Sequence, residues 1–415
     1  MRTSAASDPV IWDPAEQLPR EELRALQASR LHATFGVEIS ALAEQPFAFK
    51  SALREAYPFG LLRVPVSELV RVHASSGTHG KPTVVGYTRA DLDAWTELMA
   101  RCMTMAGVRP GMLLHNANTY GLFTGGHGFH QGAERIGATV LPVSGGMTAR
   151  QALLLNDFGA QAICATPSYS LVIAAAVREA GIDPSSLKLE LGLFGGEPWT
   201  EGLREQIERE LPTMKAVNFY GLSEMCGPGV ATECVEVRDG LHVHEDHFLV
   251  EVVDPDTGAV LDEGVEGELV FTTLLKEAMP LLRYRSGDIG SLTFEPCACG
   301  RTTARIRGLR GRRDDMLIVR GVNIYPSNVE HLLLSVPEVA PHYQLVVERS
   351  GTMDELTVQC EPASSEVDAG SLGSIVENLL REHIGIRIAV EVLPPGDVPR
   401  SEGKAVRVVD RRAGG

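Results

Sequence analysis

The chain has 415 residues, of which 44% are hydrophobic, and a formal net charge of −16 at pH 7. This length exceeds one ordinary domain and predicts two, while the acidic charge argues against nucleic-acid binding through bulk electrostatics. Apolar runs such as Leu171–Val177 are too short to cross a membrane, and residues 1–14 lack the apolar core of a signal peptide. Seven cysteines, an odd and low count, favour reduced thiols and a cytoplasmic protein.

Helices and short apolar strands alternate through residues 90–221, after a helical region at 14–35 and a strand–loop–strand pattern at 68–88. The expected helices are 90–107, 129–137, 149–159, 168–181 and 200–212, and the expected strands are 112–118, 138–143, 160–167, 187–196 and 215–221. This alternation is typical of a mostly parallel, doubly wound sheet, in which ligands bind beyond the carboxyl ends of the strands.

The pattern changes after residue 230. Residues 247–274 alternate in hydrophobicity around two turn signals, which indicates an antiparallel β region. The pattern of a small α+β domain follows a charged stretch at 311–321. Its expected helices are 327–336 and 372–385, and its expected strands are 342–350, 355–362 and 389–394. We therefore expect an α/β fold with a large N-terminal domain, residues 1–312, and a small C-terminal domain, residues 313–415.

Residues Ser75–Pro82 read SSGTHGKP, with two glycines, several hydroxyls and a lysine. A P-loop needs G-x-x-x-x-G-K-[ST] between a strand and a helix, and this segment has neither that spacing nor a following helix. A nucleotide switch of the P-loop type is therefore excluded. Backbone N–H groups and hydroxyls can still wrap a phosphate, but the same residues also suit a hairpin turn, so this segment alone leaves both readings open.

Five further motifs follow in chain order. They are GGEPW at Gly195–Trp199, YGLSEMCGPG at Tyr220–Gly229, RYRSGDIG at Arg283–Gly290, GRRDDMLIVRGVNIYPSNVE at Gly311–Glu330 and PRSEGKAVRV at Pro399–Val408. Together with Ser75–Pro82 they resemble the adenylate-forming enzymes, which include acyl-CoA synthetases, nonribosomal adenylation domains and luciferase. The match is best with the phenylacetate–CoA ligase branch and extends over nearly all of the chain from about residue 50.

The resemblance implies an enzyme that joins a carboxylate to AMP, releases pyrophosphate, and passes the acyl group to coenzyme A. The first step needs positioning and positive charge near the phosphates. It implies Lys404 as the catalytic cation between acyl carboxylate and α-phosphate, Glu224 as the ligand of Mg²⁺, and Asp314 as the hinge of a mobile C-terminal domain. The implied ATP contacts are Ser75, Ser76, Gly77, Thr78, Gly80, Lys81, Gly196, Glu197, Pro198, Asn218, Tyr220, Gly221, Ser223, Asp288 and Arg312.

Blander alternatives exist for these charged residues. Glu224 could be a carboxylate at a helix N-terminus, and Asp288 and Arg312 could belong to surface ion pairs. Only the order of the motifs favours the functional interpretation over these alternatives.

The implied acyl pocket departs from the family. Its expected wall is Tyr120, Phe123, Gly125, His127, Gly196 and Pro228. Where the family reads like YGLFTGGLGAHYGAE, this chain reads YGLFTGGHGFHQGAE, so His127 and Gln131 replace an apolar and an aromatic residue. Because a buried imidazole or amide must be hydrogen-bonded, these residues predict either a hydroxy- or amino-substituted aryl acid or contacts to the scaffold.

Four residues could hold a structural Zn²⁺. Cys297 and Cys299 form a C-x-C pair, and Cys234 and His242 flank a turn, so together they offer four nitrogen and sulfur ligands. His244 and His247 are rival ligands. Reduced thiols without metal are the alternative, since the spacing matches no standard zinc pattern.

We therefore expect an ATP-dependent aryl-acid–CoA ligase that uses ATP, Mg²⁺ and coenzyme A, with a homodimer left open. One rival is an adenylating enzyme that passes the aryl group to a carrier protein or an amine. Another is a non-catalytic binding protein of the same fold, against which the presence of Lys404, Glu224 and Asp288 argues.

Overall fold

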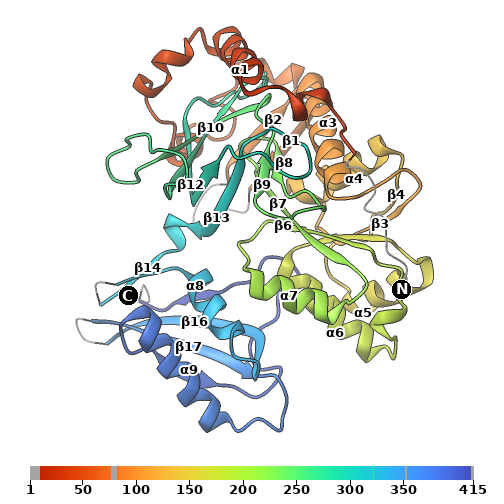
Figure 1. The fold of residues 1–415 in the computed structure, drawn as a ribbon, viewed down its shortest axis with the longest axis vertical. Coiled ribbons are helices and arrows are strands. Elements are labelled where there is room, and N and C mark those ends of the chain that lie inside the picture. Colours follow the sequence, from red (N-terminus) through yellow and green to blue (C-terminus); the bar gives the residue numbers. More distant parts are fainter. Residues whose placement is uncertain (1–9, 76–81, 321, 351–352, 413–415) are drawn as a thin grey trace.

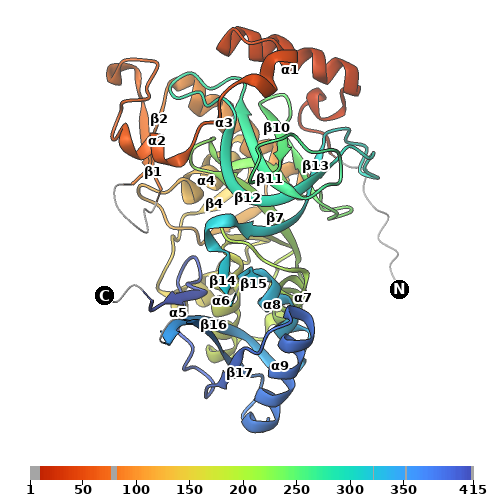
Figure 2. The same cartoon turned by 90° about the vertical axis from the view of Figure 1, so that its left-hand side faces the viewer.

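The computed structural model describes residues 10–75, 82–320, 322–350 and 353–412. Figures 1 and 2 show a large body that contains most of the chain and a smaller group of elements, from β14 onward, at one end of it. Within the part of the chain that the structure describes, no helix combines the length and the apolar character needed to cross a membrane.

One sheet of eleven strands forms the centre of the large body, in the order β10-β11-β12-β13-β9-β8-β7-β6-β5-β3-β4. The parallel part contains β3 (Leu113–Asn116), β4 (Thr139–Leu141), β5 (Ala162–Ala165), β6 (Leu191–Gly195) and β7 (Lys215–Leu222). The antiparallel part contains β8 (Gly227–Thr232), β9 (Leu241–Val243), β10 (Phe248–Val253), β11 (Gly267–Thr273), β12 (Tyr284–Thr293) and β13 (Arg305–Arg312). The predicted α/β class is confirmed, and the antiparallel region continues the parallel sheet rather than forming a separate one.

The helices of the large body have the expected sequence signals. They are α1 (Arg20–Phe35), α2 (Lys50–Glu55), α3 (Arg89–Met105), α4 (Thr124–Ile136), α5 (Thr148–Phe158), α6 (Pro167–Glu179) and α7 (Glu201–Glu210). Thr88 and Asp91 form a capping box at the start of α3, and Thr166 caps α6 just before Pro167. All four residues of β5 are buried, as expected for a central parallel strand with helices on both faces.

Helix α4 begins five residues earlier than the sequence pattern predicted. Its first five residues include Gly125, Gly126 and Gly128, which are poor helix formers but permit close packing. A Cβ at Gly126 would lie 2.8 Å from the carbonyl oxygen of Thr119, and one at Gly128 would lie 2.9 Å from Cγ of Pro228. Tertiary packing therefore decides this helix start, and it moves His127 into the first turns of α4.

The smaller body has a separate apolar core around Leu345, Val358 and Val376. Its elements are β14 (Leu317–Val319), β15 (Val322–Ile324), α8 (Pro326–Leu334), β16 (Val339–Ser350), β17 (Met353–Pro362), α9 (Ala369–Ile384), β18 (Ala389–Val392) and β19 (Val408–Asp410). The sheet order is β18-β17-β16-β19, and α8 contacts α7 of the large body. The division into domains at residue 313 stays a prediction.

Candidate active site

Lys404 belongs to a loop of the smaller body that lies against the carboxyl ends of β5 and β6. Thr166, which follows β5, donates a hydrogen bond from Oγ1 to the carbonyl oxygen of Gly403 at 2.8 Å. The N–H of Ala405 donates to Oε2 of Glu197, two residues beyond β6, at 2.7 Å. A Cβ at Gly196 would lie 3.6 Å from Cε of Lys404. The structure therefore brings Lys404 to the edge of the sheet where doubly wound folds bind ligands.

The Lys404 side chain is exposed to solvent, although many protein atoms lie around it. Partial desolvation lowers the pKa of its ammonium, and Glu197 and Asp288 oppose that shift while Lys50 and Arg312 add to it. These four charged residues come from distant parts of the sequence, and all of them act on Lys404. Lys404 therefore lies among charges of both signs.

Tyr220, Asp288 and Arg312 lie on three strands of the same sheet. The Tyr220 hydroxyl on β7 donates to Oδ2 of Asp288 on β12 at 2.5 Å, and Asp288 is directly opposite Arg312 on β13. Burial raises the pKa of Asp288 to about 6, against the effects of the Tyr220 hydrogen bond and the Arg312 charge. Asp288 is 8% exposed, so a surface ion pair is not the right description of this residue.

Glu224 lies in the turn between β7 and β8 and is only 3% exposed. Its carboxylate is 3.1 Å from the ammonium of Lys50 in α2, and its backbone carbonyl accepts a hydrogen bond from Lys276 at 2.8 Å. Burial lowers the pKa of Lys276 to about 8. The helix N-terminus considered for Glu224 is wrong, because this turn leads into a strand. The sequence motifs did not point to Lys50 and Lys276; the available signal was that lysine is rare among the 38 basic residues of this chain.

The glycine-rich loop connects two antiparallel strands, β1 (Arg71–Ala74) and β2 (Val84–Tyr87). Ser75 closes the hairpin by donating from its N–H to the carbonyl oxygen of Thr83 at 2.9 Å. The other expected phosphate contacts of this loop lie outside the described residues; they are Ser76, Gly77, Thr78, Gly80 and Lys81.

The remaining expected nucleotide contacts lie along the same edge of the sheet. Asn218 on β7 lies opposite Phe194 on β6. Gly221 packs so closely on β8 that a Cβ would lie 2.0 Å from the Gly227 carbonyl oxygen. Ser223 is in the turn that carries Glu224. Pro198 packs 3.5 Å from the Cβ position of Gly311. Their contact with ATP stays a prediction.

The expected acyl pocket surrounds the start of α4. The Tyr120 hydroxyl accepts a hydrogen bond from Nδ2 of Asn116 at 2.8 Å and pairs with Nδ1 of His130 at 3.0 Å. The ring of half-buried His127 lies 5.2 Å from that of Tyr120 and 5.3 Å from that of His73. The Tyr120 hydroxyl thus already has hydrogen-bond partners within the protein, and the polar ring of His127 lies beside the Tyr120 ring.

Other predicted pocket residues line the same helix start. Phe123 is the residue before α4 and is 43% exposed, and the three atoms nearest to a Cβ at Gly125 all belong to Asn118, at 3.8 Å. Pro228 packs on Gly128. Gln131 accepts a hydrogen bond from Nη1 of Arg71 at 3.0 Å, so its carbonyl contacts the scaffold.

The expected hinge residue Asp314 is in the short helical turn η5 (Arg313–Asp315) between β13 and β14. This is where the chain passes from the large to the smaller body (Figure 1). Its role as a hinge stays a prediction.

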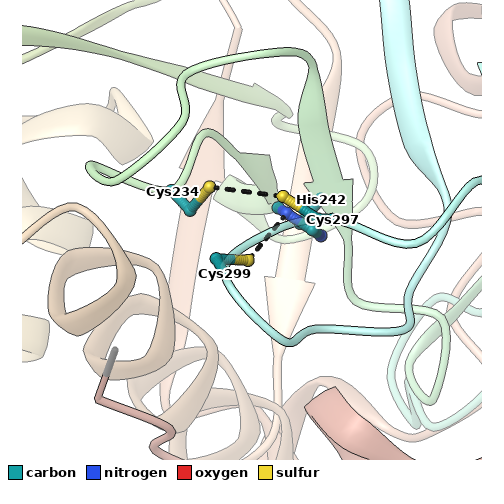
Figure 3. A group of neighbouring side chains, drawn as sticks. All are labelled: Cys234, His242, Cys297 and Cys299. Atoms are coloured by element: carbon teal, nitrogen blue, oxygen red, sulfur yellow. Dashed lines mark hydrogen bonds between the residues drawn. The ribbon is translucent and has the colours of Figure 1, made fainter. Parts of the chain in front are cut away.

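Cys234, His242, Cys297 and Cys299 form a buried cluster in which one ligand atom from each residue lies within 4.8 Å of all the others (Figure 3). The Sγ atoms of Cys234 and Cys297 are 3.8 Å apart, and Sγ of Cys299 is 3.5 Å from Nε2 of His242. Two sulfurs on one tetrahedral zinc would lie about 3.8 Å apart, and a sulfur and a nitrogen about 3.6 Å apart. The cluster therefore fits one tetrahedral ion.

The two rival histidines have other partners. His244 contacts Sγ of Cys102 through Nε2 at 3.0 Å, and His247 pairs with Asp246 at 3.4 Å. Thr303 Oγ1 is 3.1 Å from Nδ1 of His242 and leaves Nε2 of that ring for the cluster.

Two family models match the chain. The model described as AMP-binding enzyme matches residues 39–274, and that described as AMP-binding enzyme C-terminal domain matches residues 321–412. The phenylacetate-coenzyme A ligase of Thermus thermophilus is 50% identical over 96% of this chain and 98% of that protein. The enzyme of the same name from Escherichia coli is 44% identical over 96% of this chain and 97% of that protein.

The fold is also similar to solved structures of 2-hydroxyisobutyryl-CoA ligase, which is 30% identical to this chain. In its postadenylation state with 2-HIB-AMP, that ligase matches with a TM-score of 0.88 over 96% of this chain and 92% of that one. In its thioesterification state with 2-HIB-AMP and CoA, the TM-score is 0.68 over the same shares of both chains. Identity and coverage are equal, so the two scores differ because the two states differ in arrangement.

Proposed function

The chain belongs to the AMP-binding enzyme family, in its phenylacetate–CoA ligase branch, and we propose that it activates an aromatic carboxylic acid and transfers it to coenzyme A. It is an AMP-forming acid–CoA ligase. ATP and the acid would give an acyl-adenylate and pyrophosphate, and the thiol of coenzyme A would then displace AMP. The phenylacetate-coenzyme A ligases that match this chain support an aromatic acid as its substrate.

The placement of Lys404 is the single observation that carries this proposal. An ammonium at the carboxyl ends of β5 and β6, under the influence of Asp288 and Arg312, lies where nucleotide phosphates are expected. Such a cation would stabilise the charge that develops as the acyl carboxylate attacks the α-phosphate. Asp288 would accept hydrogen bonds from the ribose hydroxyls. Glu224 would hold Mg²⁺, a hard cation that prefers oxygen ligands.

The arrangement of the two bodies supports an adenylation-competent state. The similarity is greater to the postadenylation state of 2-hydroxyisobutyryl-CoA ligase than to its thioesterification state. We propose that the C-terminal domain, residues 313–415, rotates about Asp314 after adenylation. This rotation would withdraw Lys404 and admit coenzyme A.

We propose further that the acid carries a hydroxyl or amino group. The Tyr120 hydroxyl and the Gln131 carbonyl already have protein partners. His127 is half-buried beside Tyr120, and the backbone carbonyl of Gly121 accepts a hydrogen bond from one nitrogen of its ring. A polar substituent on the aryl ring would supply the hydrogen bond that the second nitrogen of a partly buried imidazole requires.

A panel of aryl acids tests this function. Phenylacetate, benzoate and their hydroxy and amino derivatives are incubated with Mg²⁺ and ATP, with and without coenzyme A, and pyrophosphate, AMP and thioester are measured. We expect pyrophosphate with one or more acids, and thioester only when coenzyme A is present. Absence of pyrophosphate with every acid would refute adenylation, and ADP in place of AMP would refute the mechanism. Adenylation without thioester would favour a carrier protein or an amine as acceptor.

We also propose that Cys234, His242, Cys297 and Cys299 bind one structural Zn²⁺. The separations of their sulfur and nitrogen atoms support this assignment. A fully occupied set of four ligands leaves no open position for catalysis. The ion would fix the loop between β12 and β13, the two strands that carry Asp288 and Arg312.

The setting of the enzyme is a further proposal. All seven cysteines are free and buried, which supports a reducing compartment such as the cytoplasm. A homodimer is testable by light scattering after size-exclusion chromatography.

A further inference from the structure

The carboxylate of Glu197 connects two parts of the chain that lie more than two hundred residues apart. Its Oε1 accepts hydrogen bonds from the N–H of Ser168, at 2.7 Å, and from the Ser168 hydroxyl. Its Oε2 accepts the N–H of Ala405, at 2.7 Å. Both oxygens of Glu197 therefore have protein donors, although the sequence prediction placed this residue among the contacts of ATP.

The backbone is anchored on both sides of Lys404. On one side, Thr166 donates from Oγ1 to the carbonyl oxygen of Gly403 at 2.8 Å. On the other side, Glu197 accepts the Ala405 N–H. Thr166 and Ser168 belong to the start of α6, so one rigid helix end supports both anchors. The Lys404 side chain extends between these two fixed points, past Gly196.

Glycines allow the loop to approach so closely. A Cβ at Gly145 would lie 3.3 Å from the carbonyl oxygen of Glu402, and one at Gly146 would lie 3.1 Å from a carboxylate oxygen of that residue. Gly196 has φ +85°, a left-handed conformation that other residues rarely adopt. The backbone of the large body thus permits residues 402–405 to pack closely against it, and we call the loop seated when it is packed in this way.

We propose that Glu197 is a positioning residue that holds Lys404 in place for adenylation, a role that rests on the proposed function. The Glu197–Ala405 hydrogen bond requires the two bodies to be arranged as in this structure. A contact made in one arrangement only shifts the equilibrium toward that arrangement. Hydrogen bonds to a charged group are strong enough that losing this one lowers the population of the seated loop about 10- to 100-fold.

The substitution Glu197→Gln removes the negative charge and keeps the shape of the side chain. The amide that it introduces has one acceptor oxygen, so its NH₂ group faces either the Ser168 N–H or the Ala405 N–H, and one of the two anchors is lost. Glu197→Ala removes both contacts. Glu179→Gln, on the exposed end of α6, changes the same charge far from this bridge and is the matched control.

The two half-reactions provide the test. Adenylation is measured by ATP–pyrophosphate exchange with the best acid of the panel, and thioester formation is measured separately from synthetic phenylacetyl-AMP and coenzyme A. We expect Glu197→Ala to lower exchange about 10- to 100-fold while thioester formation stays within about twofold. Lys404→Ala should show the same asymmetry, and Glu179→Gln should change neither reaction. Equal losses in both half-reactions, or no loss in exchange, would overturn the positioning role.

Hydrogen exchange at the Ala405 amide tests the contact without any substrate. This amide donates to Glu197, and we expect it to exchange faster in Glu197→Ala than in the wild-type protein while the amides of β5 and β6 are unchanged. Equal exchange rates at Ala405 in both proteins would overturn the inference. If the wild-type protein activates no acid, the proposed function fails, and the exchange rate at Ala405 still decides whether Glu197 seats the loop.

Discussion

The ammonium nitrogen of Lys50 lies 3.1 Å from a carboxylate oxygen of Glu224, the residue expected to hold Mg²⁺. The Glu224 side chain is 3% exposed, whereas that of Lys50 is 25% exposed. A buried carboxylate is costly without a counter-charge, and Lys50 provides one. A magnesium ion bound at Glu224 would take over this task, and Lys50 would become free to turn toward solvent or toward a phosphate.

Replacing Lys50 by methionine should therefore destabilise the nucleotide-free protein and spare the complex. We expect the free energy of unfolding to fall by about 1–3 kcal/mol, because Glu224 is left without its partner, and Mg²⁺ with ATP to restore much of the loss. Denaturant unfolding with and without Mg²⁺–ATP measures both effects. Lys188→Met, at an exposed position, is the control. Equal losses with and without the nucleotide would contradict the exchange of partners.

Asp288 should make stability depend on pH. Burial raises its pKa from 3.8 to about 6, so the folded protein binds this proton more tightly than the unfolded chain does. The stabilisation by protonation is full below about pH 4 and is lost as the pH rises through about 6. Relative to Asp288→Asn, the wild-type protein should lose about 1 kcal/mol of unfolding free energy between about pH 5 and pH 7.

Chemical denaturation of both proteins at several pH values measures the difference between their unfolding free energies. The contributions of other titrating groups are the same in both proteins and cancel in this difference. Asp183→Asn serves as the control, since the hydrogen bond from Ser185 holds the pKa of Asp183 below its usual value, outside this pH window. A difference between wild-type and Asp288→Asn that stays constant across this window would argue against a protonated Asp288.

The parts of the site that the sequence predicted are those that form ordered motifs. The ordered motifs imply Tyr220, Asp288 and Arg312 as contacts of ATP; in the structure a hydrogen bond joins Tyr220 to Asp288, which lies opposite Arg312. The Lys50–Glu224 pair and the Glu197–Ala405 bond were not foreseen, because a single long-range contact leaves no local pattern. The early start of α4 was missed for a related reason: its glycines have low helix propensity, and only tertiary packing makes them helical.

The Cys/His cluster should contain about one zinc ion per chain when the protein is purified without chelators. Zinc at about 1,000 times its dissociation constant would stabilise the folded protein by about 4 kcal/mol, and Cys299→Ser should lose both the metal and most of this stability. Elemental analysis and thermal unfolding, with and without a chelator, measure these effects. Cys360 is a buried thiol of the smaller body, so the Cys360→Ser variant should still bind zinc at the Cys/His cluster. A fully folded, metal-free wild-type protein would exclude the ion.

His127 should decide between substituted and unsubstituted acids. Its ring lies beside Tyr120, whose hydroxyl is already engaged by Asn116 and His130, and we therefore test His127 as the side chain that recognises a polar substituent. A hydrogen bond to a neutral group is worth about 0.5–1.5 kcal/mol, or about 2- to 10-fold in kcat/KM. His127→Leu should therefore reduce the preference for a hydroxylated acid by this factor.

The measured quantity is the ratio of kcat/KM for 4-hydroxyphenylacetate to that for phenylacetate. Taking a ratio removes general losses of activity, because any damage to adenylation affects both acids alike. His383→Leu, at an exposed position on α9, should leave the ratio unchanged. A wild-type enzyme that prefers phenylacetate would contradict this role of His127. An unaltered ratio in the His127→Leu variant would also contradict it, and would show that His127 contacts the scaffold and does not bind the substituent.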